Sequence, residues 1–129
     1  MAQIAMPTKS IALIAHDGKK DEMEAFAKTH RDQLARYTLV ATATTGARIE
    51  AITGLTIQKM LSGPRGGDAQ IAAMVAEGKI EAVFFFIDPL AAQPHDPDIQ
   101  GLLRICNVHD VPLATNPATA AFIIGTKAL

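Results

Sequence analysis

The sequence IEAVFFFI, residues 80–87, decides the fold class. Positions 83–87 are apolar, and each carries a β-branched or aromatic side chain. A short run of this kind predicts a strand that is buried on both faces, as in the middle of a parallel sheet. Asp88 ends the run. We therefore expect a central strand at residues 80–87.

Strand and helix patterns alternate on both sides of this central strand. Apolar or β-branched runs predict further strands at residues 10–15, 38–43, 55–61 and 112–115. Helical spacing and helix end signals predict helices at residues 21–37, 47–52, 69–77, 97–109 and 117–124. No repeat or linker divides the chain. The expected fold is α/β, a single-domain, doubly wound three-layer sandwich with a five-stranded parallel sheet, covering residues 1–129.

The composition excludes several classes of protein. Of the 129 residues, 49% are hydrophobic and 19% are charged, which fits a soluble globular chain. The net charge of -1 supplies no basic field, so we expect neither nucleic acid nor membrane as a partner. No apolar run approaches the roughly 20 residues of a membrane span, and the first ten residues lack a signal-peptide layout. Cys106 is the only cysteine, and together these features favour the cytoplasm.

Polar residues gather where the predicted strands end. Ligands of open parallel sheets bind beyond the carboxyl ends of the strands, so these residues are candidates for a binding site. In chain order they are His16 and Asp17; Thr42, Thr44 and Thr45; the Gly-rich loop at 62–68; Asp88; and Thr115 and Asn116.

Two loops suit an anion. TATTG, residues 42–46, joins a strand to a helix, whose first N–H groups favour negative charge. The alternative is that Thr42 only caps the helix. SGPRGGD, residues 62–68, is not a Walker loop, because no Lys-Ser or Lys-Thr follows its glycines. Its Asp68 opens a helix, where capping is the alternative to catalysis.

The loop PHDPD, residues 94–98, adds acid–base candidates. We expect Asp96 before Pro97 to be an N-cap followed by proline at the first helical position. Asp98 then falls in the first turn, where an acid is favourable in any case. His95 has no evident structural role. A metal site formed with His16 matches no strong ligand spacing, so we expect no metal. Lys20 stands beside the first strand's end, although a lysine at a helix start is usually only solvated.

Six motifs together resemble the methylglyoxal synthase family over residues 10–124. They are IAHD (14–17), TATTG (42–46), MLSGPRGGD (60–68), FFIDPL (85–90), PHDPD (94–98) and ATNPATA (114–120). The resemblance implies conversion of dihydroxyacetone phosphate to methylglyoxal and inorganic phosphate, with phosphate as product and inhibitor. It also implies a sheet of order 3-2-1-4-5, a homohexamer, and no metal or organic cofactor. Many members continue further beyond the position of Ile124, so weaker regulation between subunits is expected here.

The resemblance also implies roles for single residues. Asp68 matches the catalytic base, with His95 and Asp98 as its acid–base partners. Substrate and phosphate contacts fall on His16, Lys20, Thr42, Thr44, Thr45, Ser62 and Gly63. Asp17, Gly66 and Asp88 are expected to support them. The main alternative is a non-catalytic regulatory domain of the same fold that binds phosphate or another small ligand. Such a domain could lose the acid–base set, which this chain keeps; a flavodoxin-like or response-regulator module has less support.

Overall fold

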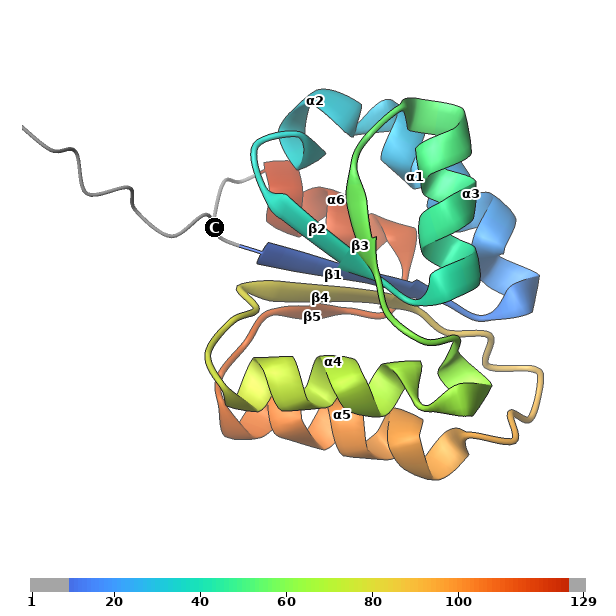
Figure 1. Ribbon diagram of the computed structural model, residues 1–129, viewed down its shortest axis with the longest axis vertical. Coiled ribbons are helices and arrows are strands. Elements are labelled where there is room, and N and C mark those ends of the chain that lie inside the picture. Colours follow the sequence, from blue (N-terminus) through green and yellow to red (C-terminus); the bar gives the residue numbers. More distant parts are fainter. Residues whose placement is uncertain (1–9, 126–129) are drawn as a thin grey trace, which may run out of the picture.

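The computed structural model describes residues 10–125, which form a five-stranded sheet between two layers of helices (Figure 1). All strand pairs are parallel, and the order is β3-β2-β1-β4-β5. The strands are β1 (Ser10–Ala15), β2 (Thr38–Ala41), β3 (Ile57–Lys59), β4 (Ala82–Phe86) and β5 (Leu113–Ala114). The predicted fold class and strand order are confirmed. The terminal residues of the expected 1–129 domain lie outside the described range.

The helices divide between the two faces of the sheet. On one face lie α1 (Lys20–Thr29), α2 (Arg31–Leu34), α3 (Ala43–Thr53) and α6 (Pro117–Gly125); on the other lie α4 (Gly67–Ala76) and α5 (Asp96–Val108) (Figure 1). Two short 3-10 turns, η1 (Asp17–Lys19) and η2 (Gly63–Arg65), precede α1 and α4. Within the described part of the chain, no helix is long and apolar enough to cross a membrane.

Strand β4 supplies the centre of both hydrophobic layers. Phe84 and Phe86 pack into the cluster under α1, α3 and α6, where their rings meet Phe26 edge-on. Val83 and Phe85 pack into the second cluster, under α4 and α5. All four side chains are fully buried. The expectation of a strand buried on both faces is therefore confirmed, and this apolar centre fixes the rest of the sheet around it.

The helix expected at residues 21–37 is instead two helices. The backbone leaves helical geometry at His30 (φ −108°, ψ 24°), and the chain bends before α2 begins. Leu34 is nevertheless fully buried, so the apolar stripe continues across the bend. The bend accompanies a long-range contact: Arg31 Nε donates a hydrogen bond to the carbonyl oxygen of Thr53, 2.7 Å away, at the end of α3.

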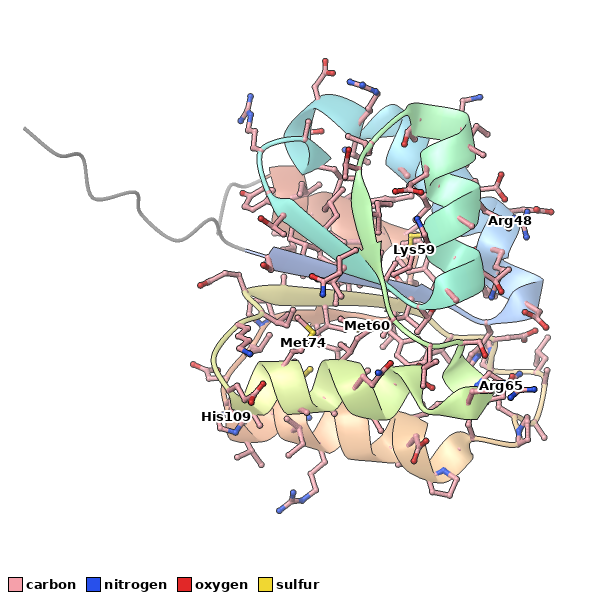
Figure 2. The ribbon with its side chains drawn as sticks, in the orientation of Figure 1. Arg48, Lys59, Met60, Arg65, Met74 and His109 are labelled. Atoms are coloured by element: carbon pink, nitrogen blue, oxygen red, sulfur yellow. The ribbon has the colours of Figure 1, made fainter. Side chains whose placement is uncertain are left out.

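Helix α3 begins earlier than expected and is tied to its neighbours by ion pairs. It starts at Ala43, not at 47, so the hydroxyl-rich stretch is helical and β2 ends at Ala41. Arg48 of α3 pairs with Asp21 and Glu24 of α1, while Lys59 of β3 pairs with Glu50 of α3. Figure 2 shows the positions of Arg48 and Lys59. Exposed pairs of this kind contribute at most about 1 kcal/mol each, so their main effect is orientation. Strands β3 and β5 are shorter than their predicted ranges.

Candidate active site

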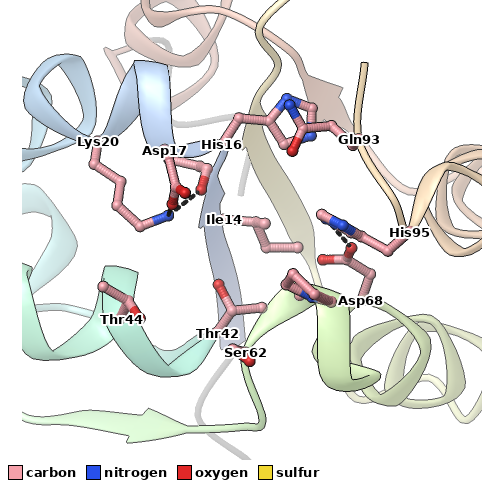
Figure 3. Close-up of a pocket in the computed structure, with 13 residues that line it drawn as sticks. Ile14, His16, Asp17, Lys20, Thr42, Thr44, Ser62, Asp68, Gln93 and His95 are labelled. Atoms are coloured by element: carbon pink, nitrogen blue, oxygen red, sulfur yellow. Dashed lines mark hydrogen bonds and ion pairs between the residues drawn. The ribbon is translucent and has the colours of Figure 1, made fainter. Parts of the chain in front are cut away.

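A polar pocket opens beyond the carboxyl ends of β1 and β2, where η2 leads into α4 (Figure 3). Its free volume of about 70 Å³ suits a molecule much smaller than the drug-sized ligands that fill ordinary pockets. The lining residues are Ile14, Ala15, His16, Asp17, Lys20, Thr42, Thr44, Ser62, Gly63, Pro64, Asp68, Gln93 and His95. Nine of the predicted site residues are therefore brought together here.

Asp68 and His95 face each other across the pocket. Asp68 Oδ2 lies 3.2 Å from His95 Nε2 (Figure 3), and the Asp68 side chain is fully buried. Burial raises the pKa of the Asp68 carboxyl above its ordinary value of 3.8, opposed by His95 and Lys20, while Asp98 adds a smaller upward effect. Within residues 10–125 neither carboxyl oxygen accepts a hydrogen bond. This carboxylate is desolvated, basic and free to accept a proton.

A capping role for Asp68 is wrong. Gly66 occupies the N-cap position of α4, and Asp68 lies inside the first turn. A similar correction applies to α5: its N-cap is His95, and the expected cap Asp96 is its first helical residue. The helix starts one residue early because the His95 carbonyl already accepts the N–H groups of Asp98 and Ile99, at 3.0 and 3.1 Å. Asp98 lies outside the pocket lining and affects Asp68 by charge only.

His16 enters the pocket from the end of β1. Its main-chain N–H donates to the Phe86 carbonyl at 3.1 Å, which continues the β1–β4 pairing by one residue. Its Nδ1 accepts a hydrogen bond from the Asp88 main-chain N–H at 2.8 Å. Burial lowers the pKa of His16 below 6.5, with His95 and Lys20 acting in the same direction, and Asp88 and Asp17 opposing. Asp88 itself lies outside this pocket lining and contacts His16 through its main-chain N–H.

Lys20 is buried, which rules out the alternative that this lysine is only solvated. Its Nζ donates to the Ala15 carbonyl oxygen at 2.7 Å and pairs with Asp17 Oδ1 at 3.1 Å (Figure 3). These contacts direct the ammonium group into the pocket. A cation is thereby fixed opposite the threonine loop, where it can pair with an anionic group.

The threonine loop presents unoccupied donors to the pocket. Thr42 is the N-cap of α3, yet its side chain makes no capping hydrogen bond in the described structure. Thr45, in the same loop, is fully buried outside the pocket lining, and its hydroxyl has no partner among residues 10–125. The Thr42 and Thr44 hydroxyls line the pocket at the first N–H groups of α3, and donors of this kind can bind phosphate.

Gly63 leaves the space in which a reacting atom can sit. A Cβ added there would lie 2.9 Å from His95 Nε2 and 3.3 Å from Asp68 Oδ2. Any larger residue would therefore fill the volume beside the acid–base pair. Gly66 is outside the lining; it acts as the N-cap of α4 and so holds the turn that carries Asp68.

Sequence reasoning missed Gln93, whose side chain lies beside His16 at the pocket (Figure 3). It follows no motif spacing that could have identified it. Within the described residues there is no group of three or more His, Cys, Asp or Glu side chains that could hold a metal ion.

Fold and pocket together define an α/β domain in which a buried carboxylate–imidazole pair shares a small pocket with a lysine and threonine hydroxyls at a helix N-terminus, as in the active sites of α/β enzymes. The MGS-like domain family matches residues 22–115. Methylglyoxal synthase of Thermus thermophilus is 63% identical over 116 residues, covering 90% of this chain and 92% of the relative. Methylglyoxal synthase of Carboxydothermus hydrogenoformans is 60% identical over 114 residues, covering 88% and 94%.

A solved structure of a methylglyoxal synthase has the same fold as this chain. Methylglyoxal synthase from Elizabethkingia anophelis NUHP1 superimposes with a TM-score of 0.85 at 44% identity, covering 92% of this chain and 78% of that one. The chain belongs to the methylglyoxal synthase family.

Proposed function

We propose that this chain is a lyase that converts dihydroxyacetone phosphate to methylglyoxal and inorganic phosphate. The observation that carries the proposal is the juxtaposition in one small pocket of a buried carboxylate with a raised pKa, an imidazole, a buried lysine and threonine hydroxyls at a helix N-terminus. Family membership supports the same substrate class. A non-catalytic regulatory domain would gain nothing from burying the Asp68 carboxylate, which destabilises the fold when ionised.

The first step is removal of a proton from the hydroxymethyl carbon next to the ketone. Asp68 is the base, since its carboxylate is desolvated and uncommitted to other hydrogen bonds in the described structure. As the C–H electron pair moves toward the carbonyl, negative charge grows on the ketone oxygen. His95, 3.2 Å from Asp68, supplies a donor to that oxygen. The space beside Gly63 is where the reacting carbon fits.

The second step breaks the bond between carbon and phosphate oxygen. The terminal hydroxyl of the enediolate gives its proton to the departing phosphate and becomes the aldehyde, the double bond shifts, and phosphate leaves with the C–O electron pair. The remaining enolate then takes back, at its methylene carbon, the proton that Asp68 removed, and becomes methylglyoxal. No oxidant or reductant is needed, because atoms and electrons balance within the substrate.

The geometry of the phosphate decides between elimination and isomerisation. Elimination requires the C–O bond to stand perpendicular to the enediol plane, so that its orbital overlaps the π system. We assign that role to the α3 N-terminus with Thr42 and Thr44, and to the Ser62–Gly63 turn, which reach the pocket from two elements. Thr45 lies outside the pocket lining, and we propose that it supports this loop. Lys20 supplies positive charge to the departing anion. The same donors would hold free phosphate, so we propose inorganic phosphate as a competitive inhibitor.

We also propose a homohexamer that works in the cytoplasm without a metal or organic cofactor. Large apolar side chains remain exposed on the single chain, with Leu90 at 95% and Phe122 at 73%. Exposed apolar groups of this size favour association between copies. The sole cysteine is buried and unpaired, and its elevated pKa of about 11, caused by burial, makes it unreactive, as suits a reducing compartment.

The experiment that tests the function is incubation of purified protein with dihydroxyacetone phosphate in the presence of a chelator, with methylglyoxal trapped as it forms. We expect methylglyoxal to appear at an undiminished rate. A reaction that the chelator abolishes, and that added metal restores, would contradict the metal-free mechanism.

A further inference from the structure

His16 is held in one tautomer by the main chain that follows the neighbouring strand, β4. A main-chain N–H can only donate, so the Asp88 N–H, 2.8 Å away, requires His16 Nδ1 to be an unprotonated acceptor. In the neutral ring the proton must then be on Nε2. Protonating Nδ1 as well would set two N–H groups against each other and break this hydrogen bond.

The opposite ring nitrogen is buried and has no partner among residues 10–125. The His16 side chain is only 5% exposed, lines the pocket, and packs edge-on against Phe85 and His95, with ring centroids 5.2 and 6.0 Å apart (Figure 3). A buried donor without a partner is unfavourable, and in native proteins such a group needs a specific explanation, such as a catalytic role or a bound water or ion. The Nε2–H group of His16 is therefore available to donate a hydrogen bond to a ligand in the pocket.

The surroundings keep the ring neutral. Four charged or titratable groups face it: His95 at the start of α5, Lys20 of α1, Asp88 after β4 and Asp17 of η1. Burial and the first two disfavour a second proton and together outweigh the carboxylates, so the pKa lies below its ordinary 6.5. A neutral ring with a fixed N–H is a hydrogen-bond donor and not a phosphate-binding cation.

The Asp88 main chain is itself held in place. Asp88 Oδ1 accepts the Leu90 N–H at 3.0 Å, which closes a tight turn after β4. Asp88 Oδ2 lies next to Gly18, where it leaves no room for a side chain. A Cβ added to Gly18 would lie only 2.5 Å from this oxygen. Gly18 thus leaves room for the Asp88 carboxylate, and the turn presents its N–H to His16.

We propose that His16 serves the reaction as a neutral donor through Nε2–H, fixed in that form by the Asp88 main-chain N–H, and that it binds the substrate oxygen that becomes negative when the carbon-bound proton is removed. The proposal rests on the proposed function. His16 and His95, whose ring centroids lie 6.0 Å apart, then donate to one oxyanion as the two donors of an oxyanion hole. His16 is in this account a catalytic residue, and Asp88 and Gly18 are positioning residues.

Two substitutions of His16 test the roles of its two ring nitrogens separately. His16→Asn places an amide near the position of Nδ1, where its oxygen can still accept the Asp88 N–H, but it cannot reach the pocket. His16→Gln places an N–H near the position of Nε2. We expect His16→Asn to lower kcat for dihydroxyacetone phosphate by about 10²–10³-fold, with KM and inhibition by inorganic phosphate little changed. His16→Gln should recover part of kcat. Unchanged kcat in His16→Asn, with phosphate inhibition weakened as in a Lys20 variant, would overturn the proposal.

A spectroscopic measurement tests the tautomer without relying on turnover or on a mutant fold. Long-range proton–nitrogen NMR of the wild-type protein with ¹⁵N-labelled histidine reports the protonation of both ring nitrogens, and the His16→Asn spectrum assigns the missing signals. We expect Nδ1 to be unprotonated and Nε2 protonated at pH 7, with titration only below 6.5. An imidazolium or an Nδ1–H form at pH 7 would refute the assignment. Failure of the proposed function would appear separately, as absence of methylglyoxal from the wild-type protein.

Discussion

Replacing Asp68 with asparagine separates catalysis from folding. The change keeps the size of a fully buried side chain and removes its charge. An amide cannot accept the carbon-bound proton, and loss of a positioned general base lowers the rate by about 10²–10⁴-fold. At 1.36 kcal/mol per decade this is about 2.7–5.4 kcal/mol of lost transition-state stabilisation. The assay is the initial rate of methylglyoxal formation at saturating dihydroxyacetone phosphate.

The same substitution should make the protein more stable at neutral pH. Burial raises the Asp68 pKa, so the folded state holds this proton more tightly than the unfolded state does. The stabilisation of the fold by the protonated Asp68 carboxyl is fully present below the ordinary pKa of 3.8. It is lost as the pH rises through the folded-state pKa. At pH 7 the wild type therefore carries a buried charge that Asp68→Asn lacks. We expect a higher Tm for the variant at pH 7 and a difference that shrinks toward acid pH.

Asp96→Asn is the matched control, because Asp96 is an exposed acid at the start of α5 and lies outside the pocket lining. It should leave kcat unchanged. The reasoning is refuted if Asp68→Asn keeps near-normal turnover, or if it loses activity because it is less stable than the wild type.

Three further predictions address binding, space and assembly. Lys20→Met should weaken inhibition by inorganic phosphate about 10- to 100-fold, because it removes a charged hydrogen-bond donor. Lys19→Met, which changes the neighbouring residue on η1, should leave inhibition unchanged. Equal inhibition constants for the two variants would contradict the assignment of Lys20. Gly63→Ala should lower kcat by about 10²-fold through displacement of the substrate beside His95, yet keep phosphate inhibition because the main-chain N–H remains; equal loss of both would count against the steric argument. Light scattering at micromolar concentration should report a mass well above the 13.7 kDa of one chain, and a monomer would exclude the proposed hexamer.

Much of the fold could be predicted because its signals are local. The run through Phe84–Phe86 is apolar on both faces, and only a central strand satisfies that pattern. The bend at His30 could not be predicted, since Phe26 and Leu34 keep one apolar stripe whether or not the helix is continuous. Helix ends depended on tertiary context. Asn116 caps α6 by accepting the Thr119 N–H at 2.9 Å, whereas Asp96, the expected cap of α5, does not cap that helix.

The site was predictable where parallel topology brings strand ends together. His16 directly follows β1, Lys20 begins the helix after it, and Asp68 lies in the first turn of the helix after β3. The sheet gathers these three side chains into one pocket. The role of Asp88 could not be predicted, because it acts through a main-chain N–H that any residue but proline possesses. Gln93 could not be predicted either, since its place beside His16 depends on the path of a loop.

The most direct test of the central claim is the product ratio from dihydroxyacetone phosphate, followed in one sample by proton and phosphorus NMR. If the pocket holds the phosphate out of the enediol plane, elimination should dominate, with one inorganic phosphate released for each methylglyoxal formed and almost no glyceraldehyde 3-phosphate. Accumulation of glyceraldehyde 3-phosphate without release of phosphate would show that the enediol is protonated and not cleaved, and would contradict the account.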